Sequence, residues 1–188
     1  MRLRGVHHVE FSVLDYEHSI AFYDRMFGWL GYKSFWTLDA GYRSTYYIAL
    51  PHSYIGIQPA KTGTEHRLDY RAQAPGIHHI AIWARSRREV ARFHTEFLVR
   101  NGIEVTEEPA EYSLYAPGYF AVFFVDPSGI RWELAFTPRI PLPWHIYRWL
   151  KTSLRTAREL APDHPEWDGS PGRAAWRAMW RKLPTRSC

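Results

Sequence analysis

The sequence predicts an α+β protein in which two β-α-β-β-β modules form a cupped mixed sheet and a helical C-terminal extension follows. The main observation is an internal repeat, because GVHHVEFSV at residues 5–13 returns as GIHHIAIWA at residues 76–84, an offset of 71 residues. A second observation is that each copy continues into a helical pattern and then into strand signals. Self-similarity at a fixed offset is the signature of a repeated structural unit.

Each module opens with a strand whose side chains alternate between two faces. In the first module, one face carries Val9, Phe11 and Val13, and the other carries His8, Glu10 and Ser12. The second module has the same alternation, with Ile80 and Ile82 opposed to His79, Ala81 and Trp83. The apolar face is the one we expect to pack on a helix.

A helix follows each opening strand, at about residues 16–31 and 87–101. Ser86 and Glu89 predict a capping box at the start of the second helix, and Gly102 predicts a left-handed residue after its end. Strand signals come next, at residues 45–50, 54–58, 119–125 and 130–136.

The repeat divides the chain into the first module (residues 1–59), a polar linker (60–75), the second module (76–137) and the extension (138–188). The segment from residue 137 onward holds ten Lys and Arg against four Asp and Glu, and five tryptophans, whereas the rest of the chain is nearly neutral. We expect the extension to dock on the body or on a second subunit. Contact with a membrane surface is the alternative, and the charge distribution argues against nucleic-acid binding.

The remaining composition favours a cytoplasmic protein in which cysteine has no structural role. The single cysteine, Cys188, excludes an intramolecular disulfide and a thiolate metal cluster. The N-terminal residues show no signal-peptide pattern, and the longest apolar run, residues 119–125, is too short for a transmembrane segment.

Two histidines and a glutamate are the strongest candidates for chemistry. His8 and His79 occupy equivalent places in the repeat, and Glu133 on the last strand is expected to point to the same side. Two imidazoles and one carboxylate suit a divalent metal, Fe(II), Mn(II), Zn(II) or Ni(II), with open coordination positions. A hydrogen-bonded core histidine is the alternative for either imidazole alone. His7 and His78 alternate to the opposite face, where we expect packing or surface roles.

The paired modules, the H-H strand openings and the sequence D-P-S-G-I-R-W-E at residues 126–133 resemble the vicinal oxygen chelate superfamily. This superfamily includes glyoxalase I, fosfomycin-resistance proteins, extradiol dioxygenases, methylmalonyl-CoA epimerase and bleomycin-resistance proteins. The resemblance covers about residues 4–137. It implies a metal held by His8, His79 and Glu133. We expect a homodimer that acts on a small-molecule substrate.

The sequence departs from parts of the family pattern. At the end of the first module, Gln58 aligns with Glu133, so we expect three protein ligands and a pocket-lining role for Gln58. A ring-cleaving dioxygenase is disfavoured, because Phe123 replaces the expected tyrosine and residues 114–116 contain no histidine.

Proton transfer requires a base, for which Glu10 and Glu133 are the candidates. Glu10 shares the strand face of His8, although a salt bridge to an arginine would also explain it. Arg43, Arg67 and Arg131 are the possible partners. The residues expected to contact substrate are Gln58, Trp83, Tyr115 and Tyr119.

Two functions are consistent with these residues. The leading hypothesis is a divalent-metal-dependent, glyoxalase-like enzyme that polarises vicinal oxygens of a small substrate in lyase, isomerase or thiol-addition chemistry. The alternative is a metal-free protein that binds or sequesters a drug or natural product in an aromatic cleft.

Overall fold

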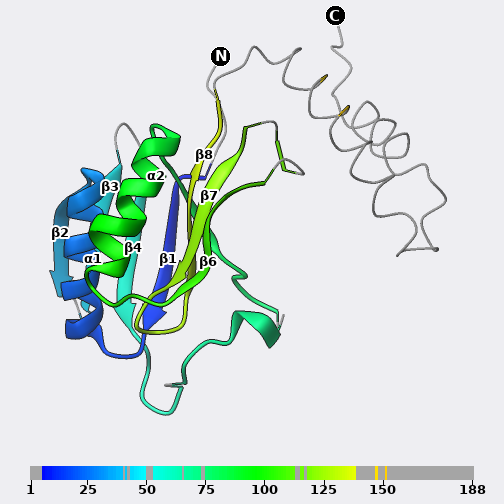
Figure 1. The fold of residues 1–188 in the computed structure, drawn as a ribbon. Helices are drawn as coiled ribbons and strands as arrows, with labels where there is room; N and C mark the ends of the chain where they lie inside the picture. Colours follow the sequence, from blue (N-terminus) through cyan, green and yellow to red (C-terminus); the bar gives the residue numbers. More distant parts are fainter. Residues whose placement is uncertain are drawn as a thin grey trace, which may run out of the picture.

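The structure is a computed structural model that describes residues 6–39, 41, 43–49, 53–64, 66–72, 75–112, 115–116, 118–138, 147 and 151. Nearly all of the predicted helical extension therefore lies outside the described residues. The elements run in the order β1 (His8–Val13), α1 (Tyr16–Leu30), β2 (Lys33–Asp39), β3 (Arg43–Ala49), β4 (Ser53–Pro59), η1 (Tyr70–Ala72), β5 (Ile80–Trp83), α2 (Arg87–Phe93), η2 (His94–Val99), β6 (Val105–Glu111), β7 (Phe120–Val125) and β8 (Arg131–Phe136) (Figure 1).

The two modules share one topology, which confirms the α+β class and the repeat. The strand orders are β1-β4-β3-β2 and β5-β8-β7-β6, and the backbone ladders form two four-stranded sheets. In each sheet the opening strand pairs in parallel with the last strand, and the other pairs are antiparallel. Because a parallel pair requires a crossover, the helix of each module covers one face of its own sheet.

Local sequence explains where the helices begin and end. The side chain of Asp15 accepts a hydrogen bond from the His18 amide at 3.0 Å, and α1 is followed by the capping residue Gly31, whose φ is 83°. Ser86 accepts from the Glu89 amide at 3.1 Å, so the predicted N-cap of α2 is confirmed. The second helix continues after Phe93 as the π-helix η2, a change of pitch that the sequence pattern did not indicate.

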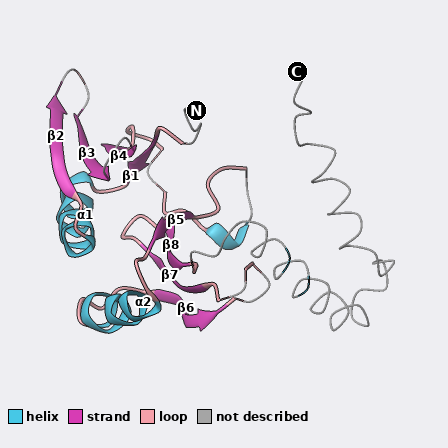
Figure 2. Cartoon of the chain, turned by 90° about the horizontal axis from the view of Figure 1, so that it is seen from above, coloured by secondary structure: helices cyan, strands magenta, loops and turns pink. Residues whose placement is uncertain are grey.

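The two helices lie side by side, and the modules share one hydrophobic core (Figure 2). The rings of Phe22 and Phe97 are 6.2 Å apart, and those of Trp29 and Phe93 are 5.2 Å apart. Trp132 of β8 is fully buried and contacts Phe11 of β1. Both sheets therefore bury their helix-facing sides together, and their other faces lie outside this core.

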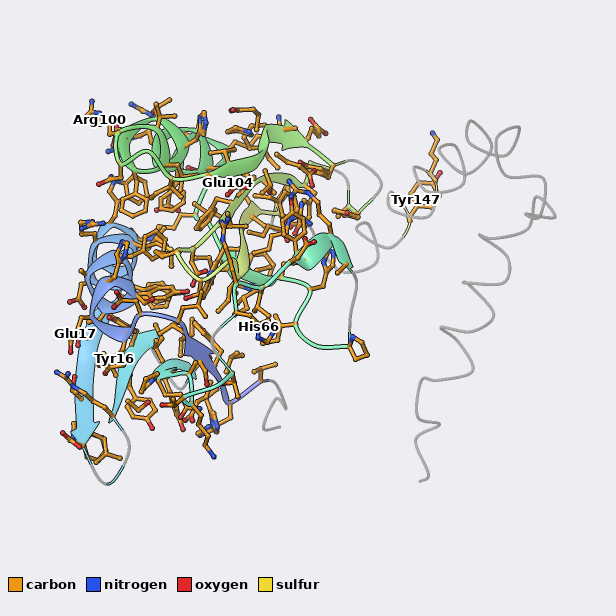
Figure 3. All side chains as sticks on the ribbon, turned by 90° about the horizontal axis from the view of Figure 1, so that it is seen from below. Tyr16, Glu17, His66, Arg100, Glu104 and Tyr147 are labelled. Carbon is orange, nitrogen blue, oxygen red and sulfur yellow. The ribbon has the colours of Figure 1, made fainter. Side chains whose placement is uncertain are left out.

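Polar contacts reinforce the joint between the modules. The hydroxyl of the buried Tyr23 on α1 donates to the Asp126 carboxylate, which begins the turn before β8. The Trp132 indole in turn donates to the Tyr23 oxygen at 3.1 Å. At the start of α1, Tyr16 shares a hydrogen bond of 2.7 Å with Thr45, and Glu17 pairs with Arg43 beside the first sheet (Figure 3). The helix is thus fixed to both modules.

No helix within the described ranges has the length and apolarity needed to cross a membrane.

Candidate functional site

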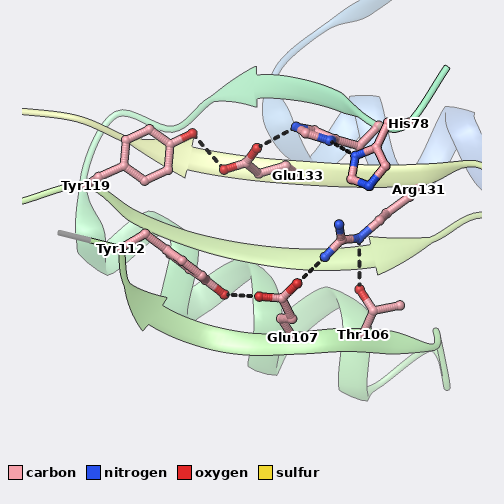
Figure 4. A network of polar contacts seen from close by, with 8 residues as sticks. His78, Thr106, Glu107, Tyr112, Tyr119, Arg131 and Glu133 are labelled. Carbon is pink, nitrogen blue, oxygen red and sulfur yellow. Dashed lines mark hydrogen bonds and ion pairs between the residues drawn. The ribbon is translucent and has the colours of Figure 1, made fainter. Parts of the chain in front are cut away.

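The second module brings two of the three predicted ligands into contact. Glu133 lies in the centre of β8 and is only 2% exposed. One of its carboxylate oxygens, Oε2, lies 3.2 Å from His79 Nε2, just before β5. The other oxygen, Oε1, accepts a hydrogen bond of 2.6 Å from the Tyr119 hydroxyl (Figure 4).

Each candidate histidine is paired with the histidine before it in the sequence. The Nδ1 atoms of His78 and His79 are 2.7 Å apart, and those of His7 and His8 are 2.8 Å apart. The expectation of packing or surface roles for His7 and His78 therefore omits a contact, because each of these rings forms a hydrogen bond with the candidate ligand that follows it. This contact engages Nδ1, which leaves Nε2 as the nitrogen that can bind a metal.

The environment favours a neutral imidazole at His79 and a protonated Tyr119. Burial lowers the pKa of His79, while the Glu133 carboxylate acts in the opposite direction. Burial and the hydrogen bond to Glu133 raise the pKa of Tyr119 above its usual value. Neutral imidazole is the form that binds metals, and the tyrosine can donate to the carboxylate at any ordinary pH.

The chemistry of this donor set fits a divalent cation. A carboxylate that is almost fully buried is costly unless a positive group compensates its charge. Imidazole nitrogen and carboxylate oxygen are ligands that Mn(II), Fe(II), Zn(II) and Ni(II) accept. His79 and Glu133 could therefore hold two coordination positions of such a metal, with Tyr119 fixing the carboxylate.

A second polar row lies beside Glu133 and was missed by the sequence reasoning. The Arg131 guanidinium pairs with Glu107, which also accepts a 2.8 Å hydrogen bond from the Tyr112 hydroxyl (Figure 4). Arg131 is also stacked between two rings, 4.3 Å from the centroid of Phe123 and 4.8 Å from that of Tyr70 in the linker. Arg131 lies two residues before Glu133 on β8. This spacing is the sequence feature that indicates a common face, because alternate residues of a strand point to the same side.

The proposed salt bridge of Glu10 is not found with any of the three arginines considered. Arg43 pairs with Glu17, Arg67 with Glu104, and Arg131 with Glu107. Glu10 instead lies on the outer face of β1, over the backbone of Gly56.

His8 is not brought to His79 and Glu133 within one chain, contrary to the expected convergence. Its ring stacks on Tyr54 of β4, with centroids 4.6 Å apart and planes inclined by 6°. Among the described residues, no three His, Cys, Asp or Glu side chains gather closely enough to hold a metal. The first module thus presents a histidine separately from the His79–Glu133 pair.

The predicted substrate contacts in the second module lie around the His79–Glu133 pair. Trp83 is 77% exposed and lines a groove of about 700 Å³ together with His79 and Tyr54. Tyr115 is 55% exposed and stacks on Tyr112, whereas the hydroxyl of Tyr119 is engaged by Glu133.

The predicted alignment of Gln58 with Glu133 is wrong. Gln58 pairs with Ser12 in the first sheet, and the repeat equivalent of Ser12, Trp83, pairs with Ala135. Gln58 therefore corresponds to Ala135. Its amide donates a long hydrogen bond of 3.4 Å to the Ser12 hydroxyl.

Comparisons with solved structures agree with this architecture. A candidate glyoxalase from Bacillus halodurans superimposes with a TM-score of 0.58 at 27% identity, covering 70% of this chain and 95% of that one. A glyoxylase/bleomycin resistance protein/dioxygenase domain from Frankia sp. EAN1pec gives a TM-score of 0.60 at 19% identity, covering 78% and 99%.

A third similar structure contains a metal. It is a variant of the fosfomycin resistance protein FosX from Listeria monocytogenes in complex with Mn(II) and 1S,2S-dihydroxypropylphosphonic acid. The TM-score is 0.54 at 17% identity, with 73% of this chain and 95% of that chain covered. At this identity the likeness shows the fold alone.

The comparison with curated proteins gives no match. The family model of the Glyoxalase/Bleomycin resistance protein/Dioxygenase superfamily matches residues 5–134, which span both modules and the linker. The match ends at β8, one residue after Glu133. The chain therefore belongs to the Glyoxalase/Bleomycin resistance protein/Dioxygenase superfamily.

Proposed function

We propose that this chain is a divalent-metal-dependent enzyme of the glyoxalase type that acts on a small, oxygen-rich substrate. The observation that carries the proposal is the buried Glu133 carboxylate beside His79 Nε2, because this pair offers a cation one oxygen and one nitrogen ligand. A bound metal would polarise vicinal substrate oxygens and stabilise negative charge that develops on them. Lyase, isomerase and thiol-addition reactions all use this chemistry.

The chain's own residues supply positioning and proton transfer. Tyr119 holds Oε1 of Glu133, and His78 orients the ring of His79. Glu10 and Glu133 are the carboxylates available to move a proton at the substrate.

His8 is proposed as a third ligand contributed by a second copy of the chain in a homodimer. In one chain His8 stacks on Tyr54, away from the His79–Glu133 pair. Apolar side chains beside both histidines are exposed and could be covered by that copy, namely Val6 at 72%, Ile77 at 47% and Trp83 at 77%.

Metal content of the purified protein tests the proposal directly. We expect protein prepared without chelator to carry a first-row divalent metal and the His79→Ala variant to lose most of it. His18→Ala, which removes an exposed histidine on α1, is the matched control and should keep the metal. Equal and negligible metal in wild type and His79→Ala would contradict the proposal.

A metal-free binding protein is the second candidate, and the aromatic surface near Glu133 favours it. Tyr112 and Tyr115 are stacked with their planes 9° apart, and Tyr115 is exposed. Such a surface could bind a flat ligand. Ligand binding that survives substitution of His8, His79 and Glu133 would support this candidate.

A further inference from the structure

The strand registers show that the two modules carry their central carboxylate on different strands. In the second module, Ala81 on the edge strand β5 is paired with Glu133 on β8. In the first module, the repeat equivalent of Ala81 is Glu10 on β1, and its partner on β4 is Gly56. The glutamate therefore lies on the opening strand in the first module and on the last strand in the second, and the small residue lies on the other strand of each pair.

The side chain of Glu10 occupies the space that a residue on β4 would use. A Cβ atom built on Gly56 would lie 2.7 Å from Glu10 Cγ and 3.1 Å from Glu10 Cδ. The first distance is shorter than real Cβ contacts and the second is tighter than most of them, so the absence of a side chain at Gly56 leaves the room into which Glu10 folds. The carboxylate of Glu10 consequently starts from the neighbouring strand and lies over the place that corresponds to Glu133.

The histidines keep the same arrangement in both modules. His8 precedes Glu10 by two residues on the outer face of β1, and its Nδ1 contacts His7 as His79 Nδ1 contacts His78. Each module therefore has one histidine whose Nδ1 contacts the preceding histidine, and one carboxylate at the equivalent pair of strand positions.

We propose that Glu10 is a metal ligand, so that His8 and Glu10 form the first-module counterpart of the His79–Glu133 pair. This inference rests on the proposed metal-dependent function and extends it to four protein ligands, two nitrogens and two oxygens. Such a set of ligands suits the same divalent metals and leaves coordination positions open for substrate oxygens. Proton transfer then falls to a carboxylate other than Glu10, and Glu133 is the remaining candidate.

The test measures metal affinity and requires no substrate. Chelator-treated full-length protein is titrated with Mn(II), and free Mn(II) is followed by electron paramagnetic resonance. Glu10→Gln should weaken Mn(II) binding by about tenfold or more, because substitution of residues that only hydrogen-bond the ligands already lowers metal affinity by about that factor. Glu17→Gln removes an exposed carboxylate on α1 and should bind like the wild type.

A strand-swap variant tests the equivalence of Glu10 and Glu133. Glu10→Ala combined with Gly56→Glu gives the first module the Ala and Glu arrangement of the second. The nearest remaining neighbour of the new side chain is the ring edge of Tyr46, 2.9 Å from the built Cβ. We expect this variant to bind Mn(II) more tightly than Glu10→Ala alone. A folded swap variant that binds no better would show that the positions are not equivalent.

The outcomes separate this inference from the proposed function. If wild type and His79→Ala bind Mn(II) equally weakly, the metal-dependent function itself fails. If His79→Ala loses binding and Glu10→Gln retains it, only the assignment of Glu10 is overturned. Because Glu10 is an exposed side chain, Glu10→Gln is expected to fold, and its melting temperature in chelator verifies this.

Discussion

Gly129 shows how one residue links the linker to the candidate site. It follows Ser128 in the turn before β8, with a φ of 85°, and the Ser128 carbonyl accepts from the Leu68 amide at 3.0 Å. A Cβ on Gly129 would lie 2.3 Å from the Leu68 carbonyl oxygen. Glycine is therefore required both by the backbone angle and by the close passage of the linker.

We predict that Gly129→Ala is more destabilising than Gly63→Ala. Gly63 has a similar φ of 88°, but a Cβ there would meet nothing within 4 Å. Both variants pay about 1 kcal/mol for the positive φ, and only Gly129→Ala adds a backbone clash of about 1–3 kcal/mol. Urea unfolding of the two variants measures the difference. Equal free energies of unfolding would mean that the linker does not rest on this turn.

At the level of single residues, the sequence predicts the candidate metal ligands better than it predicts the side chains that contact those ligands. His79 is predictable because a histidine recurs at the equivalent place in the repeat, and Glu133 is predictable because it lies on the last strand with its side chain expected on the same side. Gln58 was misaligned because matching the turns ignores the strand register, which decides the residue that faces the opening strand. The contact from Tyr119 to Glu133 depends on the register in which β7 pairs with β8, which no local sequence pattern records.

At the level of elements, α1 is held by buried tyrosine hydroxyls on both of its sides. Tyr47 of β3 donates to Asp24 at 2.8 Å, and Tyr23 donates to Asp126 in the other module. Burial, followed by the neighbouring carboxylates, raises the pKa of both phenols. The helix therefore depends on tyrosines that must remain protonated.

We predict that the protein loses stability as the pH rises above about 10, where tyrosines in the unfolded chain ionise. The folded state keeps these protons, so the unfolded state binds fewer, and the free energy of unfolding falls with increasing pH. Tyr47→Phe should lower stability at neutral pH by about 1–2 kcal/mol and make the alkaline slope shallower by about 1.4 kcal/mol per pH unit. Urea unfolding between neutral and alkaline pH measures both effects.

Val90→Ala is the control for that prediction, because it weakens the buried core without removing a titrating group. It should lower stability while keeping the wild-type alkaline slope. An unchanged slope in Tyr47→Phe would show that this phenol ionises equally in the folded and unfolded states.

Helices and strands with a buried face are easier to predict from the sequence than exposed edge strands. The opening strands, the helices and the strands 53–59, 120–125 and 131–136 have clear apolar patterns because one or both faces are covered. The edge strands β2 and β6 were expected only as part of the module pattern, without bounds. The segment VTEEPAE of β6 contains three glutamates and a proline, which an edge strand tolerates but a central strand does not.

At the level of the whole molecule, the two modules meet through their helices. His8 and the His79–Glu133 pair are not among the described residues of the core that α1, α2 and both sheets share. Periodicity could not reveal this, because the same alternating strands and amphipathic helices are compatible with modules that close on each other or with modules that each face another chain. This arrangement is the basis of the homodimer proposed above, in which two copies of the chain complete the site.

Mixed dimers provide the last prediction. A His8→Ala chain and a His79→Ala chain should each lose most of their metal. If one copy supplies His8 and the other supplies His79, the heterodimer of these chains, isolated through two different tags, has one intact site and one doubly damaged site. It should therefore hold about half of the wild-type metal per dimer. Sites completed within single chains would leave this heterodimer without metal.

The converse heterodimer pairs a wild-type chain with one that carries both His8→Ala and His79→Ala. Sites shared between copies are then all damaged, because each contains one residue from the substituted chain, so this heterodimer should lose its metal. Sites contained within a chain would instead leave the wild-type half loaded, giving about half of the wild-type content. The two heterodimers thus give opposite results for the two assemblies, and metal analysis of both decides whether the candidate site lies between two copies of this chain.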